Sequence, residues 1–202
     1  MSERDAPFSQ QLEDWLGSDE PKTLGALGDV VAEKSFAVTI LVLMFVPALP
    51  APTGGVTHVF ELITMLVAFE MIIGRTTLWI PARLASRGLG PVTTGKAVPF
   101  MIRWIRRAER HSNRRGATLF GQRWLVSLIG LIVLLFALGA ALAPPFSGLD
   151  TFPALGAVGV ALAIILEDVV VLAVATVLGL VGLLITITLG ATIVRLLRGL
   201  LG

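Results

Sequence analysis

Long runs of apolar residues, separated by short polar or Pro/Gly-rich stretches, dominate the chain from residue 36 onward. The five runs cover Phe36–Leu49, Val59–Ile73, Trp124–Ala143, Phe152–Leu166 and Val169–Leu189. A helix needs about 20 apolar residues to cross a hydrocarbon layer of about 30 Å, and the third and fifth runs are that long. The other three contain 14 to 15 residues, which reach only about 22 Å. The pattern therefore predicts an all-α, polytopic membrane bundle in which some segments are short or re-entrant.

The apolar runs form two hairpin-like halves, each interrupted by a turn rich in proline and glycine. The turn residues are Pro50, Pro52, Gly54 and Gly55 in the first half, and Pro144, Pro145 and Gly148 in the second. Short segments broken by Pro and Gly at matching positions of two halves are typical of duplicated transporter folds, so we expect an inverted repeat. Chance similarity between two apolar hairpins explains the pattern equally well.

Charge divides the chain into four regions. These are an acidic amphipathic lead-in (1–34), a first membrane hairpin (35–74), a basic connector (75–123), and a second membrane region with an amphipathic C-terminal tail (124–202). The lead-in holds eight acidic and three basic residues, whereas the connector holds eleven basic residues and one acid. Lys and Arg near membrane segments favour the cytoplasmic side, so we expect the connector in the cytoplasm.

Amphipathic segments are also expected outside the apolar runs, including a final stretch at Ile193–Leu201 that is compatible with either membrane surface. In the lead-in, Phe8, Leu12, Trp15 and Leu16 share one helical face, which we interpret as a half-buried helix rather than a partner-binding arm. In the connector, a helix beginning near Pro99 has one apolar and one basic face. The apolar face comprises Phe100, Met101, Trp104, Ile105 and Ala108, and the basic face Arg103, Arg106, Arg107 and Arg110. We expect such a helix to lie among anionic lipid headgroups; a helix docked on the bundle would show a similar pattern, and the two placements are compatible.

Three carboxylates next to or within apolar runs are the candidate chemical groups: Glu70, Glu167 and Asp168. A charged carboxylate in a membrane is costly, so each must pair, stay protonated or line a wet cavity. One interpretation is a proton or cation site. The other is that Glu70 pairs with Arg75 at a membrane edge and that the adjacent acids form a tight interfacial turn.

Composition narrows the class of protein further. Of the 202 residues 55% are hydrophobic and 15% are charged, and the mean hydropathy is +0.86, far from the composition of an ordinary soluble domain. Cysteine is absent, which excludes disulfides and cysteine-ligated metals. The two histidines fit no metal-ligand or catalytic pattern, and no phosphate-binding glycine loop is present. We expect no enzymatic activity, cofactor, metal or nucleic-acid partner.

The segment Gly74-Arg75-Thr76-Thr77-Leu78-Trp79-Ile80-Pro81 resembles a motif of the ExoD family of exopolysaccharide-synthesis membrane proteins. Leu78 stands where the family usually has its first proline, while Trp79 and Pro81 match. A second resemblance runs from Pro145-Phe146 through Pro153-Ala154 to Glu167-Asp168, followed by Val169 where the family usually has glycine. The resemblance implies a role in making or exporting surface polysaccharide, but no reaction.

Two hypotheses of function remain. The first is an accessory protein of exopolysaccharide synthesis or export in the bacterial inner membrane, which contacts anionic lipid, other polysaccharide-assembly proteins and a second copy of itself. In this hypothesis Arg75 and Trp79 contact lipid or phosphate at a helix end. The second is a small proton- or ion-coupled transporter built around the intramembrane carboxylates.

Overall fold

The computed structural model describes residues 7–23, 26, 34–49, 56–75, 98–110, 116–144 and 147–201. The helices are α1 (Phe8–Gly17), α3 (Ser35–Phe45), α4 (Val56–Ile72), α6 (Val98–Glu109), α7 (Ala117–Phe120), α8 (Arg123–Ala141), α9 (Thr151–Leu166) and α10 (Val169–Leu201). Within these residues the fold is all-helical, as the sequence predicts. The predicted turn residues Pro50, Pro52, Gly54, Gly55 and Pro145 lie outside the described residues, as does Trp79.

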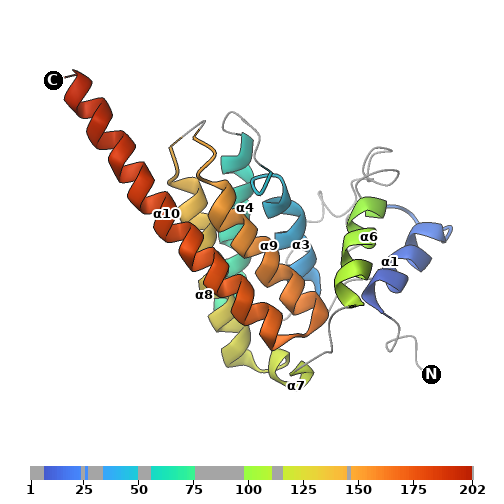
Figure 1. The fold of residues 1–202 in the computed structure, drawn as a ribbon. Coiled ribbons are helices and arrows are strands. Elements are labelled where there is room, and N and C mark those ends of the chain that lie inside the picture. Colours follow the sequence, from blue (N-terminus) through green and yellow to red (C-terminus); the bar gives the residue numbers. More distant parts are fainter. Residues whose placement is uncertain are drawn as a thin grey trace.

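Five helices, α3, α4, α8, α9 and α10, pack side by side into the main bundle (Figure 1). At one end, which we name the connector end, α3 and α8 begin and α4 and α9 finish, so that Lys34, Gly74, Arg123 and Glu167 line one cavity. The opposite end, which we name the turn end, holds the α3–α4 and α8–α9 turns. Neither α4 nor α9 turns back halfway, because each extends from the turn end to the connector end.

The two hairpins, α3–α4 and α8–α9, run in the same direction, because both begin at the connector end. Helix α4 packs on α8, and the corresponding helix of the second hairpin, α9, packs on α3. Two such units are related as parallel repeats, whereas inverted repeats enter the bundle from opposite ends. The expectation of an inverted repeat is therefore wrong for these two hairpins, although their pairing is symmetric.

Small residues bring α9 and α10 into close contact. A Cβ atom added at Gly156 of α9 would lie 2.4 Å from the Cα atom of Gly179 in α10, and one added at Gly159 would lie 2.8 Å from the Cβ atom of Ala175. The fully buried ring of Phe136 in α8 lies over the same crossing. Helices in lipid associate through this kind of close backbone approach, since no hydrophobic force drives them together there.

Helix α10 is longer than its apolar run predicts. It continues without a break through Gly190 to Leu201 and extends well past the rest of the bundle (Figure 1). The amphipathic tail expected at Ile193–Leu201 is thus the last part of the same helix. The Oγ1 atom of Thr186 donates a hydrogen bond to the carbonyl of Leu149 (2.7 Å) and marks the level of the turn end on α10.

The lead-in helix α1 and the connector helix α6 pair with each other, and α6 contacts α9 of the bundle. Leu12 of α1 and Ile105 of α6 are both fully buried. The backbone N–H and the Oγ atom of Ser9 both donate to the carboxylate of Glu109, which places the connector's single acid at the positive N-terminal end of α1. Protein therefore covers Ile102 and Ile105 of α6, whereas Phe100 (38% exposed) and Trp104 (57% exposed) of its predicted apolar face remain exposed.

Candidate anion-binding pocket at the connector end

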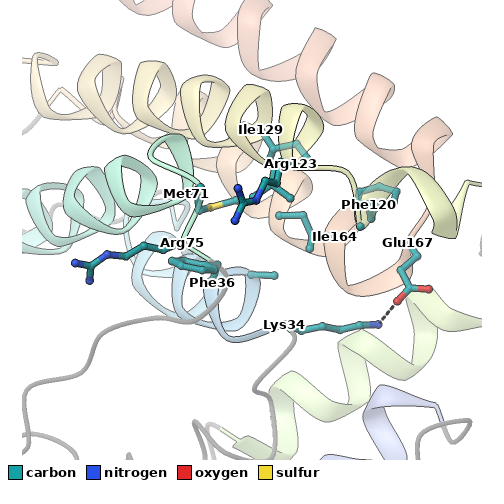
Figure 2. Close-up of a pocket in the computed structure, with 13 residues that line it drawn as sticks. Lys34, Phe36, Met71, Arg75, Phe120, Arg123, Ile129, Ile164 and Glu167 are labelled. Atoms are coloured by element: carbon teal, nitrogen blue, oxygen red, sulfur yellow. Dashed lines mark ion pairs between the residues drawn. The ribbon is translucent and has the colours of Figure 1, made fainter.

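A cavity of about 400 Å³ opens at the connector end between the ends of α3, α4, α8 and α9 (Figure 2). Its inner surface is apolar and is formed by Phe36, Ala37, Met71, Phe120, Val126, Ile129 and Ile164. Charged side chains surround this surface: Lys34, Arg75, Arg123 and Glu167. Charged residues stand where the apolar runs begin and end. Because four of these helix ends meet at the cavity, their charged side chains lie around it. We name this cavity the connector-end pocket.

Lys34 and Glu167 close one side of the pocket. The Lys34 Nζ atom lies 3.1 Å from Glu167 Oε1 and donates a hydrogen bond to the carbonyl of Ile165 at 2.7 Å. A cation at this point also meets the negative end of the α9 dipole. The two side chains are 15% and 25% exposed, so the pair is shielded more than a surface ion pair and ties the start of α3 to the end of α9.

The turn between α9 and α10 explains the two adjacent acids. Glu167 adopts a left-handed conformation (φ 53°), and the N–H of Asp168 donates to the carbonyl of Ala163 (3.1 Å), which is the helix-ending pattern usually made by glycine. The Oδ1 atom of Asp168 then accepts hydrogen bonds from the N–H groups of Val170 (2.9 Å) and Val171 (3.4 Å). Asp168 is therefore the N-cap of α10.

Helix α4 ends at the pocket in the same way, with a glycine in the special position. Gly74 is left-handed (φ 79°), and the N–H of Arg75 donates to the carbonyl of Glu70 at 3.1 Å. The side chains of these two residues also pair, with Arg75 Nη1 lying 3.6 Å from Glu70 Oε1. The geometry matches the edge-pairing interpretation of Glu70. In the paired hairpins Gly74 is equivalent to Glu167, so the two carboxylates do not occupy equivalent positions.

Arg123 is the pocket's third cation. It is the first residue of α8, its side chain is exposed, and Figure 2 shows it between Met71 and Ile129. Among the described residues it forms no ion pair, whereas Lys34 and Arg75 each face a carboxylate. The pocket thus combines an apolar interior with one uncompensated guanidinium, which is the donor geometry that suits a phosphate or carboxylate.

The remaining predicted site residues lie elsewhere. On α6, Arg106 pairs with Glu13, which raises the pKa of Arg106, and Arg103 lies 6.0 Å from the centre of the Phe100 ring. Arg107 belongs to the same helix and Arg110 follows its last residue, Glu109; none of these four arginines lines the pocket. Pro144 and Gly148 lie in the turn between α8 and α9, where Gly148 is left-handed (φ 67°).

Three charged residues that the structure brings to attention are missing from the site residues predicted from the sequence. Two of them line the connector-end pocket and one lies elsewhere in the bundle. Lys34 and Arg123 were assigned to region boundaries, although each is the last charge before an apolar run and so belongs at a helix end. The third is Glu61, which the structure places in the interior of α4, fully buried, with its Oε2 atom 2.7 Å from Nδ1 of His58. Its position inside an apolar run, nine residues before Glu70, was the available signal.

Comparison with known proteins gives a family and one relative without an assigned function. The family model described as "Exopolysaccharide synthesis, ExoD" matches residues 8–188. An uncharacterized protein of Synechocystis sp. (strain ATCC 27184 / PCC 6803 / Kazusa), slr1875, is 28% identical over 153 residues, which cover 74% of this chain and 71% of that protein. No solved structure matches the chain significantly.

Proposed function

The chain belongs to the ExoD family of exopolysaccharide-synthesis proteins, and from this premise we propose that it is an inner-membrane protein that binds an anionic, phosphate-bearing lipid in the connector-end pocket. Its role is accessory and non-enzymatic: it holds or presents such a lipid to the proteins that assemble or export the polysaccharide. The observation that carries the proposal is the pocket itself, with an apolar interior beside the guanidinium of Arg123, which forms no ion pair with any residue that the structure describes.

Membrane integration is supported by the low burial of the two longest apolar helices. Residues Arg123–Ala141 and Val169–Thr192 are long and apolar enough to cross a bilayer, and only 44% and 28% of these segments are buried within the protein. The core helix of a soluble protein would be mostly buried. Exposed large apolar side chains follow both helices, including Leu128, Leu131, Leu135, Leu138, Val174, Val177, Leu178, Val181 and Leu184. Such a continuous apolar surface fits lipid.

The proposed orientation places the connector end in the cytoplasm, because the connector carries eleven of the chain's basic residues. The chain contains no cysteine, so single cysteines give clean labelling sites. Ser86→Cys and Ser112→Cys in the connector should react with an impermeant thiol reagent only after cells are permeabilised. Ser147→Cys, at the turn end, should react in intact cells. Labelling of the connector cysteines in intact cells would overturn this orientation.

The positions of the predicted carboxylates favour an accessory protein over a carrier built around them. Glu70 and Glu167 lie at helix ends beside basic partners, Arg75 and Lys34, and Asp168 caps a helix. A carrier site would place such groups near the middle of the bundle. At the connector end Glu167 instead lines a pocket whose mouth would lie at the level of lipid headgroups.

The experiment measures lipid binding by the full-length protein in nanodiscs. The probes are a long-chain alkyl phosphate, the corresponding alcohol without phosphate, and inorganic phosphate. We expect the alkyl phosphate to bind best, because the pocket offers both an apolar surface and a cation. Arg123→Gln should weaken its binding about tenfold or more, the usual effect of losing a charge-assisted hydrogen bond.

Arg103→Gln is the matched control, since Arg103 is an exposed arginine that does not line the pocket. It should bind the alkyl phosphate as the unmodified protein does. Equal binding of alcohol and phosphate, or equal losses in the Arg123 and Arg103 variants, would contradict the proposal. In cells whose own copy is deleted, the Arg123 variant should restore less polysaccharide than the Arg103 variant at equal protein level.

A further inference from the structure

A second polar site lies inside the turn-end half of the bundle, away from the connector-end pocket. Glu61 is in the second turn of α4, and its side chain has no exposed surface. One carboxylate oxygen, Oε2, contacts His58, while the other, Oε1, has no hydrogen-bond partner among the described residues. A buried carboxylate oxygen without a partner costs free energy unless the group is neutral or paired, so this position needs an explanation beyond packing.

His58 connects Glu61 to the surface. The two residues are three apart on α4, and the 2.7 Å separation of Nδ1 and Oε2 is a short hydrogen-bond distance. The His58 side chain is 35% exposed, whereas that of Glu61 is fully buried. The imidazole therefore has one side toward the outside and one nitrogen on the carboxylate, which is the arrangement of a proton relay.

The charges around this pair are few. Helices α3 and α9 contain no ionisable residue, and α8 contains only Arg123, at the connector end. Asp150, the residue before α9, is the other acidic group whose charge acts on Glu61. No described cation therefore compensates the pair from a neighbouring helix, and its net charge depends on the proton it holds.

We infer that His58 and Glu61 form a proton-binding site that exchanges with the turn-end side through the imidazole. In the resting pair His58 is neutral and its Nδ1–H donates to the Glu61 carboxylate. A hydronium ion in the solvent donates a proton to Nε2 and becomes water, and the Nδ1 proton passes to Oε2, which leaves a neutral imidazole and a neutral carboxylic acid. Release follows the reverse path, and no other reactant is consumed. The site does not depend on the proposed lipid pocket.

The chain contains two histidines, so His111→Gln leaves His58 as a single reporter for ¹⁵N-histidine NMR of the full-length protein in detergent. Two interacting groups titrate in two coupled steps. We therefore expect the His58 signals to follow a two-step curve in the His111→Gln protein. Adding Glu61→Gln, which preserves shape but holds no exchangeable carboxyl proton, should leave one step and move its midpoint by about one pH unit or more.

Glu70→Gln on the same helix is the control and should leave the His58 curve unchanged, while Asp150→Asn should move it, because the Asp150 charge acts on Glu61. A single step in the His111→Gln protein would overturn the inference, and this measurement does not require the Glu61 variant to fold. A titration that is the same with and without Glu61→Gln would overturn it as well. Both outcomes are independent of whether lipid binds at the connector end.

Discussion

The crossing of α9 and α10 provides a direct test of the packing, through the substitution Gly156→Ala. The added Cβ atom would lie 2.4 Å from the Cα atom of Gly179 and 3.0 Å from a ring carbon of Phe136. Ordinary contacts begin near 3.4 Å, so the two helices must separate by about 1 Å. Overpacking a tight site costs about 1–3 kcal/mol. The nearest atom here belongs to the backbone of Gly179 and cannot rotate away, so we expect a cost of about 3 kcal/mol. Replacing glycine in a helix returns about 1 kcal/mol, which leaves a net loss of about 2 kcal/mol.

The assay is thermal unfolding of the purified protein in one detergent, followed by helical circular dichroism. For a chain of this size about 2–4 °C corresponds to 1 kcal/mol, so the midpoint should fall by about 4–8 °C. Gly17→Ala is the control, because a Cβ atom there meets nothing within 4 Å and should cause no loss. If the midpoint for Gly156→Ala equals that of the unmodified protein, close backbone packing of α9 on α10 is refuted.

Two further predictions concern the turn between these helices. Asp168→Ala should lower the free energy of unfolding by about 0.5–2 kcal/mol, because it removes the N-cap of α10, whereas Asp168→Asn should cost only a few tenths; equal losses in chemical denaturation would show that the cap is unimportant. Both Glu167→Gly and Glu167→Gln lose the charge that pairs with Lys34, but only glycine relaxes the left-handed backbone. The glycine variant should therefore be about 1 kcal/mol more stable than the glutamine variant, and the reverse order would exclude strain at this residue.

The sequence predicts the helical class and most helix positions because long apolar runs leave few alternatives. It does not predict which side of each helix faces protein. Helix α4 is apolar on nearly every side, so periodicity does not distinguish Glu61, fully buried, from Glu70, which lies at the helix end beside Arg75. Only the packing of α4 on α3 and α8 decides this.

The sequence does not predict the connector-end pocket, for a related reason. Lys34 and Glu167 are 133 positions apart and carry no local signal of their contact. The sequence also does not predict the relative direction of the two hairpins. A Pro/Gly turn shows that the chain reverses, but not at which end of the bundle each hairpin begins. In contrast, the amphipathic pattern of Ile193–Leu201 predicted a separate surface stretch, yet no proline interrupts the α10 pattern and the helix continues to Leu201.

The length of α10 sets a lower limit on how much of this helix lies outside the hydrocarbon layer of the proposed membrane. Its 33 residues span about 50 Å at about 1.5 Å per residue, against a hydrocarbon layer of about 30 Å. Even at a tilt of about 40°, the steep limit for membrane helices, crossing that layer uses about 39 Å of helix. With the start of α10 at the connector-end edge of the hydrocarbon layer, at least about 10 Å of the helix lies outside that layer at the turn end. Arg195 lies nine residues beyond Thr186, so the unbroken helix holds this charge about 14 Å past the turn along its axis.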